Sequence, residues 1–447
     1  MFFNFEYLFL HKNTYEHSKQ QTANRLINSF YFAILMLVIV IFSPQCKKEK
    51  INGSKDSMDK KNGIIDNIAY ITPTDSFFVD LEVAQIYATY MNAADTSYDG
   101  EEAREIESDY PILDEDEIPC MWVFNYEDGG WLILSADYRH EPIMAYNHDG
   151  SFLPDTIPPA LGMWIDASIE SINLLRTGEH DNTFEGLNAW RTTHTEYNLV
   201  TRLTGKRPMP TDGEDPQDSL CIRGIRHIKG PLLQTTWGQN CTYNDLTPSC
   251  STNCDHAPTG CVATAIAQVM HYFNKPSSSF NYSIMSLNNG NAEVQKLMED
   301  MGDNVSMDYD CSDGSGATFD NYKEVLENSY GYSNSEGKDY NLTELLSNIT
   351  NNKPVILKGC HARVQKKWWQ LFNPKYTYDE CHAWVCDGYT KTEYCTYTTI
   401  NYLHMNWGWH EVGGGNDYNG MYRFNSWNIA NGFNFQYINK MVSNITP

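Results

Sequence analysis

One segment near the middle of the chain limits the fold more than any other. From residue 261 to residue 273 the sequence reads CVATAIAQVMHYF, which is small or apolar at almost every position and contains good helix formers. The Lys275-Pro276 pair predicts where this helix stops, because the residue before a proline disfavours helical backbone. A helix that is apolar nearly all round is typically buried. The segment therefore predicts a helix inside the core of a sizeable domain.

Cys261 is the first residue of this predicted helix, and that position favours a reactive thiol. Unpaired backbone N–H groups and the helix dipole stabilise an anion at a helix N-terminus, which lowers the pKa of a thiol there. Gly260 lets the backbone approach closely just before it. The alternative is an inert thiol among apolar side chains, which is the commoner fate of such a cysteine.

A thiolate nucleophile needs a base, and His382 is the candidate. It stands at the mouth of a predicted buried strand, residues 383–386, that ends in an Asp-Gly turn, so we expect its ring to be held rigidly. Asn406, on a neighbouring predicted strand, is expected to bond to the imidazole and fix its tautomer, with Trp407 shielding that bond from water. The competing candidates for the base are His404 and His410.

Attack of a thiolate on a carbonyl creates an oxyanion, which needs hydrogen-bond donors. The backbone N–H of Cys261 is one candidate donor. The side-chain amide of Gln239, in a Trp-Gly-Gln segment upstream, is the expected second donor. Gln234 and Gln268 are weaker candidates, since Gln268 lies two helical turns beyond Cys261.

The start of the chain predicts export. A polar, basic lead-in precedes an apolar run at residues 30–42, which is short for a membrane span. We therefore expect residues 1–45 to be an export signal, although the lead-in is long for one, which leaves an internal start open.

Cys46 follows shortly after the apolar run and resembles a bacterial lipid acceptor. The two residues before it, Pro44 and Gln45, depart from the small residues usual at that point, so plain secretion and an uncleaved membrane anchor stay open as alternatives. Residues 46–65 are polar and charged, which is typical of a flexible tether.

The sequence pattern of residues 66–200 predicts a small α+β unit. This unit contains no obvious nucleophile–base pair. Apolar residues recur there at helical spacing in two segments, and two short apolar runs are separated by Glu-Asp-Gly-Gly, which is a hairpin signal. The predicted elements are a helix at 80–91 capped by Asp80, a solvated acidic loop at 99–117, strands at 121–125 and 131–135, and a helix at 161–175.

The next segment, residues 201–229, is polar, basic and proline-containing, as exposed and easily cleaved linkers are. From residue 230 the sequence becomes rich in Trp, Tyr, Gly and Cys, which marks a second domain at 230–447.

Charge and cysteine content narrow the classes of partner and ligand. The chain has 32 basic and 57 acidic residues, a net charge of −25, so nucleic acid is not an expected partner. If Cys46 takes lipid and Cys261 is a nucleophile, ten of the 12 cysteines remain, and export permits disulfides. Cysteines cluster just before Cys261 and around His382, but their irregular spacing favours disulfides or free thiols over structural zinc. We expect no metal and no cofactor.

Four motifs, in this order along the chain, resemble those of the streptopain-like (C10-type) cysteine peptidases. A further segment, residues 128–137, resembles the inhibitory propeptide of that family. The motifs are Trp237-Gly238-Gln239, Gly260-Cys261-Val262-Ala263-Thr264-Ala265, His382-Ala383-Trp384 and Asn406-Trp407-Gly408-Trp409.

This resemblance implies an α+β protein, with a papain-like catalytic domain at 230–447 and a small α+β inhibitory propeptide at 66–200. It implies a cysteine endopeptidase made as a zymogen, which acts on proteins or peptides and is inhibited by its own propeptide. The expected location is extracellular or on a bacterial cell surface, with membrane contact only through lipid at Cys46. The implied roles are Cys261 as nucleophile, His382 as base, Gln239 as oxyanion donor, and Asn406 with Trp407 as support for His382.

The chain also departs from the family pattern. Extra cysteines stand between Gln239 and Cys261, cysteines occupy positions 381 and 386 around the base, and His410-Glu411 replaces a usual Gly-Gly, which bears on the shape of the substrate cleft. Two rival hypotheses are a binding or adhesion lipoprotein whose protease site has decayed, and a transferase that passes the acyl group to an amine.

Overall fold

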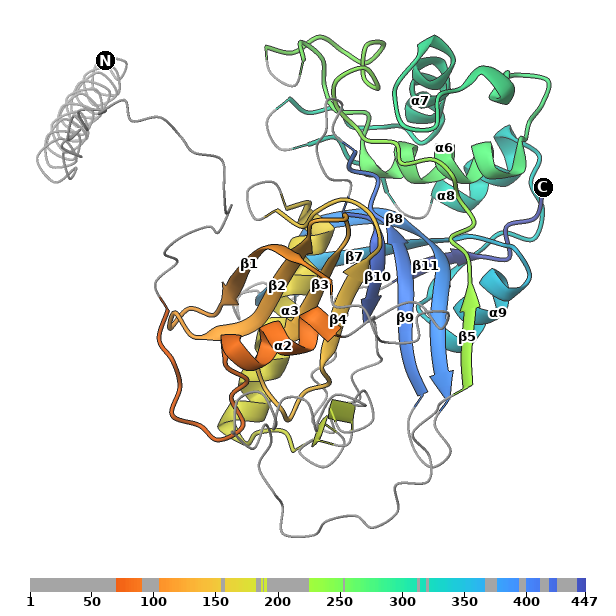
Figure 1. Ribbon diagram of the computed structural model, residues 1–447. Coiled ribbons are helices and arrows are strands. Elements are labelled where there is room, and N and C mark those ends of the chain that lie inside the picture. Colours follow the sequence, from red (N-terminus) through yellow and green to blue (C-terminus); the bar gives the residue numbers. More distant parts are fainter. Residues whose placement is uncertain are drawn as a thin grey trace, which may run out of the picture. The chain divides into compact units, whose positions relative to one another are not determined.

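The computed structural model describes residues 70–90, 104–153, 157–181, 186–187, 189–190, 225–251, 254–311, 314–318, 321–365, 376–393, 399–410, 418–423 and 440–447 (Figure 1). The chain divides into two units, residues 1–60 and 61–447, and every described residue belongs to the second unit. The predicted export signal and tether, Cys46 among them, lie outside the described residues, as does most of the predicted linker at 201–229.

The described strands form a single antiparallel sheet (Figure 1). Strand β5 (Ile225–Lys229), which covers the end of the predicted linker, pairs with β8 beside the main path. The main path runs in the order β1 (Ile106–Leu113), β2 (Pro119–Tyr126), β3 (Trp131–Ser135), β4 (Ile143–Asn147), β10 (Gly420–Arg423), β9 (Thr399–Asn406), β8 (Tyr376–Glu393), β7 (Val355–Gln365), β11 (Lys440–Ser443) and β6 (Glu336–Asp339).

The N-terminal elements follow the apolar patterns of the sequence. Helix α2 (Leu81–Tyr90) begins after Asp80, whose carboxylate accepts a hydrogen bond from the Val83 backbone N–H at 2.9 Å, so the predicted cap is confirmed. Strands β2 and β3 form the predicted hairpin, and α3 (Pro159–Thr177) contains the predicted second helix. Alternate residues of the hairpin pack against α2 on one face and α3 on the other, because successive side chains of a strand point to opposite faces.

The solvated loop predicted at 99–117 is wrong, because β1 occupies residues 106–113 of that segment. Its backbone pairs with β2 from Ile106 to Leu113 with two shifts in register, and Tyr110 is buried with its hydroxyl donating to the Phe152 carbonyl at 2.7 Å. Acidic side chains are tolerated in β1 because it is an edge strand of the sheet, and edge strands face solvent on one side. Glu107, for example, is exposed.

The C-terminal part places helices on both faces of β7 and β8. Helix α6 (Cys261–Phe273) packs against β8 and α7 in one core cluster, whereas α3 and α9 contribute to the cluster on the opposite face. Within the described ranges, no helix combines the length and hydropathy needed to cross a bilayer. The remaining helical elements are α7 (Ala292–Asn304), α8 (Asn321–Glu324), α9 (Leu342–Thr350), a 3-10 turn η2 (Tyr282–Ile284) and a π-helical turn η3 (Val325–Ser329).

The sheet continues from the predicted propeptide into the predicted catalytic domain. Strand β4 pairs with β10 through Tyr146 opposite Met421 and Ala145 opposite Tyr422. One core cluster combines residues of both parts, including Trp164 from α3 and Trp407 from the end of β9. The two predicted domains therefore share hydrogen bonds and a core, and their boundaries stay predictions.

Strand β8 is longer than predicted, which changes the position of the candidate base His382 along the strand. The predicted turn at Asp387-Gly388 is wrong, because β8 continues through both residues to Glu393 with a shift in register against β9. The buried Asp387 carboxylate accepts from the Leu233 backbone N–H at 2.8 Å and contacts His404 Nδ1 at 2.6 Å, which satisfies its charge inside the fold. His382 therefore lies inside a long strand and not at its mouth.

Candidate active site

Cys261 is the first residue of α6, as predicted, and the preceding residue has to be glycine. Gly260 has φ +87°, a backbone conformation that side chains disfavour. A Cβ there would also lie 2.6 Å from both Sδ and Cε of Met307. The thiol therefore stands at a helix N-terminus where free backbone N–H groups favour an anion.

Cys261 and His382 lie close enough across the contact between α6 and β8 that each shifts the pKa of the other. Both residues are buried, with exposed fractions of 9% and 4%. Burial by itself would raise the pKa of Cys261, but the charge of His382 and the hydrogen bond to it outweigh burial, so this pKa is lowered. Backbone hydrogen bonds at Ala383 and Val262 lower the pKa of the thiol further.

The imidazole shows the opposite shift. Burial by itself would lower the pKa of His382, but the charge of Cys261, the hydrogen bond to it and the Trp407 carbonyl raise this pKa above its ordinary value. A lowered thiol pKa and a raised imidazole pKa both favour transfer of the proton from sulfur to nitrogen. The two groups titrate as a coupled pair.

The orientation of the ring is set by a backbone carbonyl. His382 Nε2 lies 3.0 Å from the Trp407 carbonyl oxygen, and because a carbonyl only accepts, Nε2 carries a hydrogen. Nδ1 is then the nitrogen left for Cys261. The predicted hydrogen bond between Asn406 and the imidazole is wrong. The Asn406 side-chain amide bonds instead to the Thr235 carbonyl and to the Gln268 side chain.

Two tryptophans flank the imidazole, and neither is the one expected. The ring of Trp384 lies nearly parallel to that of His382, with centroids 6.3 Å apart, and Trp409 meets it edge-on at 6.0 Å. The ring of Trp407 packs on Trp384 and Tyr422, at centroid distances of 5.3 and 5.1 Å, while its carbonyl contacts His382. Trp384 and Trp409 had no assigned role in the sequence, because only packing reveals which ring lies beside an imidazole.

Gln239 is buried and joins two segments of the site. Its backbone carbonyl accepts from the Thr259 N–H at 2.9 Å, two residues before Cys261. Its side-chain Nε2 donates to the Gly408 carbonyl at 3.2 Å, next to Trp407. The preceding Gly238 allows this closeness, because a Cβ there would lie 2.0 Å from the His410 carbonyl oxygen.

The two competing histidines make other contacts. His404 Nδ1 pairs with the Asp387 carboxylate, and the backbone of His410 lies over Gly238. Of the three candidates for the base, all within the described ranges, only His382 is among the groups that shift the pKa of Cys261.

Comparison with known families agrees with this arrangement. The model of the peptidase C10 family matches residues 237–292 and 279–419, which include all five candidate site residues. The model of the Spi protease inhibitor matches residues 81–172, within the predicted propeptide. The chain is a C10-family cysteine peptidase with a propeptide.

Relatives of this C10 peptidase include streptopain from Streptococcus pyogenes serotype M28 (strain MGAS6180). It is 27% identical over 339 residues, which are 66% of this chain and 72% of that protein. The thiol protease/hemagglutinin PrtT of Porphyromonas gingivalis is 24% identical over 346 residues, 68% of this chain but 34% of PrtT. The structure of a Prevotella intermedia prointerpain A fragment has the same fold, with a TM-score of 0.51, 22% identity and coverage of 77% of this chain and 99% of that one.

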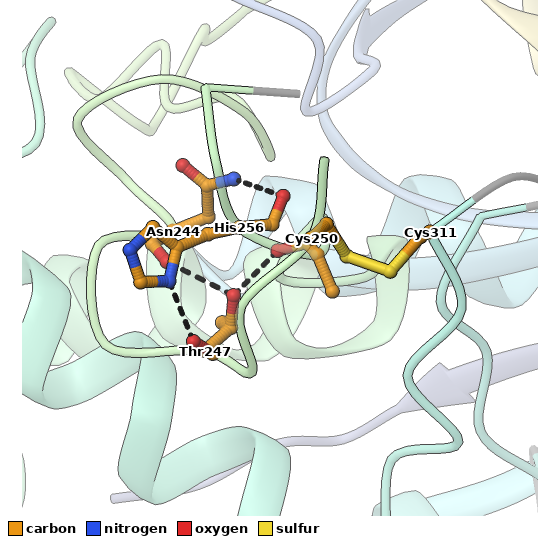
Figure 2. Close-up of a disulfide and its surroundings, with 6 residues drawn as sticks. Asn244, Thr247, Cys250, His256 and Cys311 are labelled. Atoms are coloured by element: carbon orange, nitrogen blue, oxygen red, sulfur yellow. Dashed lines mark hydrogen bonds between the residues drawn. A yellow bond between two sulfur atoms is a disulfide. The ribbon is translucent and has the colours of Figure 1, made fainter. Parts of the chain in front are cut away.

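The C10 peptidase carries disulfides on the loop between Gln239 and Cys261. Cys241 bonds to Cys254, and Cys250 bonds to Cys311, which ties the loop to the segment after α7. Figure 2 shows the second disulfide beside a group of hydrogen bonds within the loop. In this group Asn244 Nδ2 donates to the His256 carbonyl at 3.0 Å, His256 Nδ1 contacts the Thr247 carbonyl at 2.7 Å, and Thr247 Oγ1 donates to the Ala257 carbonyl at 2.5 Å.

A third disulfide lies directly beside His382. Cys360 on β7 bonds to Cys381 on β8, and the next pair in register is Gly359 opposite His382. The prediction of disulfides or free thiols is confirmed for the described cysteines, since Cys120 and Cys386 are buried free thiols. Among the described residues, no group of three or more His, Cys, Asp or Glu side chains could hold a metal ion.

Proposed function

We propose that this zymogen is an exported endopeptidase in which Cys261 is the nucleophile and His382 the base. The observation that carries the proposal is the coupling of these two buried side chains, which lowers the pKa of Cys261 and raises that of His382. The thiolate attacks a peptide carbonyl carbon, and the imidazolium gives its proton to the leaving amine. Water, deprotonated by the neutral imidazole, then hydrolyses the thioester and regenerates the thiol.

We assign the oxyanion to the Cys261 backbone N–H and the Gln239 side chain. A primary amide has two N–H donors. One of those of Gln239 bonds to the Gly408 carbonyl, which fixes the side chain and leaves the second N–H for the oxyanion. Trp407 supports the base through its carbonyl, and Asn406 supports it indirectly by holding the backbone next to Trp407.

The decisive experiment replaces Cys261 with Ala and Cys386 with Ala in separate full-length proteins. We expect Cys261→Ala to abolish both self-processing and peptide hydrolysis, and Cys386→Ala, a second buried thiol, to keep both. Full activity in Cys261→Ala would refute the assignment. Mass analysis of products distinguishes hydrolysis from acyl transfer to an amine, and an activity-based thiol probe that failed to label Cys261 would favour a decayed site.

We further propose that the propeptide at 66–200 covers the site until the chain is cut within 201–229. The inhibitor-model match and the pairing of β4 with β10 support this. A chain that begins at Ile225 keeps β5 and is expected to be more active than the full chain without its export signal. If it were no more active, inhibition by the propeptide would be wrong.

Export is supported by three disulfides in the described part of the chain, because such bonds persist in oxidising compartments. We propose that Cys46 carries the lipid of a bacterial surface lipoprotein. Mass spectrometry of the protein from its own host tests this directly. A Cys46→Ser variant should move from the membrane fraction to the medium, and an unchanged distribution would contradict lipidation.

A further inference from the structure

Gln268 lies fully buried on α6, and its side chain closes a ring of hydrogen bonds. Gln268 Oε1 accepts from Thr235 Oγ1 at 3.0 Å and from the Trp237 backbone N–H at 3.2 Å. Gln268 Nε2 donates to Asn406 Oδ1 at 3.0 Å, and Asn406 Nδ2 donates to the Thr235 carbonyl at 2.7 Å. The ring therefore connects α6 with the segment before Gln239 and with the end of β9.

Backbone groups fix the orientation of both amides in this ring. The Trp237 N–H can only donate, so the Gln268 atom facing it is the oxygen, and Nε2 must face Asn406. The Thr235 carbonyl can only accept, and the Gly408 N–H, 3.3 Å from Asn406 Oδ1, can only donate. No other assignment of the amide oxygens and nitrogens satisfies these three backbone groups. An acceptor placed at the position of Gln268 Nε2 would therefore face Asn406 Oδ1, which is itself an acceptor.

The ring adjoins every group to which the proposed function gives a role. Cys261, Thr264 and Gln268 follow at spacings of three and four, so they share one face of α6. Thr264 contacts Gly408, where an added Cβ would lie 3.2 Å from Thr264 Cγ2. Trp237 lies two residues before Gln239, and Asn406 directly precedes the residue whose carbonyl bonds the base.

We propose that Gln268 is a positioning residue that sets the oxyanion donor and the support of the base relative to the nucleophile. This inference rests on the proposed function of Cys261 and His382. Gln268 does not touch the reacting atoms; it joins the three backbone segments that carry them. A shift of about 1 Å between such groups costs about a hundredfold in rate, so loss of the ring should lower kcat more than it changes KM.

Gln268→Glu is the sharpest test, because a protonated Glu donates one hydrogen bond as Gln does, whereas a carboxylate only accepts. Burial and the facing Asn406 oxygen raise the pKa of the introduced carboxyl. The variant should therefore be about a hundredfold slower than wild type at the alkaline end and recover to within about tenfold as the pH falls. Expressing activity as a ratio to wild type at each pH cancels the titrations of Cys261, His382 and His271.

Gln295→Glu on α7 is the matched control. Gln295 Nε2 is likewise a donor, to the Thr242 carbonyl at 2.8 Å and to Asp245 at 2.9 Å, but it has no part in the ring. Its ratio to wild type should not change with pH. The full-length variants are matured by limited trypsin digestion, the trypsin is inhibited, and folding is checked at each pH by near-ultraviolet circular dichroism.

The outcomes separate the role of Gln268 from the proposed function. A folded Gln268→Glu enzyme whose ratio is flat with pH would overturn the positioning role, whether that enzyme is active or not. If Gln268→Glu does not fold, Thr235→Val decides, because it removes one donor of the ring at similar volume. A kcat at least about threefold lower supports the role, and an unchanged kcat overturns it. Activity in Cys261→Ala, measured alongside, would instead defeat the proposed function.

Discussion

Replacing Glu141 with Gln should loosen the propeptide. Glu141 lies just before β4 and forms an ion pair with Arg423 on β10, in the C-terminal part of the chain. Arg423 is only 3% exposed, and burial lowers its pKa to about 9. Two of its guanidinium nitrogens, Nε and Nη1, are buried without a partner, so Glu141 is the group that compensates this charge within the described part of the chain.

The structure gives the size of the effect. Removing one partner of a buried ion pair costs about 3–5 kcal/mol, because the remaining charge is left uncompensated. At about 1.4 kcal/mol per tenfold, the propeptide should open about a hundred to several thousand times more often. The exposed pair of Arg104 and Asp128 is the matched comparison, since Asp128 is 69% exposed and such pairs contribute about 0–1 kcal/mol.

The assay is the rate at which an excess of thiol probe labels Cys261 in the unprocessed zymogen. Glu141→Gln should label faster by about two to three orders of magnitude, and Asp128→Asn by less than about tenfold. Replacing both partners, Glu141→Leu with Arg423→Met, should return the rate toward that of wild type, because an apolar pair leaves no buried charge. Equal labelling rates in Glu141→Gln and wild type would refute the reasoning.

Three further predictions concern thiols, a helix cap and a disulfide. At neutral pH a thiol probe should label Cys261 but neither Cys120 nor Cys386. Burial raises the pKa of Cys120 to about 12 and that of Cys386 well above its usual range. Peptide mapping by mass spectrometry checks this. Asn341→Ala removes the cap of α9, where Asn341 Oδ1 accepts from the Glu344 N–H at 2.9 Å, and should cost about 1 kcal/mol in a denaturant titration. Replacing both Cys250 and Cys311 with Ser opens a loop of sequence separation 61 and should lower the free energy of unfolding by about 2–4 kcal/mol; an unchanged midpoint would contradict it.

The local elements could be predicted because their determinants are close in sequence. The helix from Cys261 needs only a run of small and apolar residues after a glycine, and the hairpin of β2 and β3 needs two apolar runs around a Gly-Gly turn. Asp387-Gly388 misled the prediction because turn chemistry is a local signal. The bonds of Asp387 to Leu233 and His404 keep those residues within β8, and both partners are distant in sequence.

Candidate residues for the site could be proposed from the sequence, but not all of their contacts. A thiol at a helix start and a histidine in a strand are visible in the sequence. A backbone carbonyl as the partner of the base is not, because every residue has one, so Asn406 was expected where the Trp407 carbonyl lies. Gln268 was set aside because of its distance along the helix from Cys261, whereas its contacts come from segments that pack against that helix.

The central claim is that Cys261 and His382 form a thiolate–imidazolium pair in the mature enzyme. The most direct measurement is the rate of Cys261 alkylation against pH, in wild type and in His382→Ala. The lowered pKa of Cys261 predicts that wild-type reactivity appears at lower pH than for an ordinary thiol, and peptide hydrolysis should decline as the pH passes the raised pKa of His382. In His382→Ala burial dominates, so reactivity should appear only at higher pH. Identical alkylation profiles in the two proteins would contradict the account.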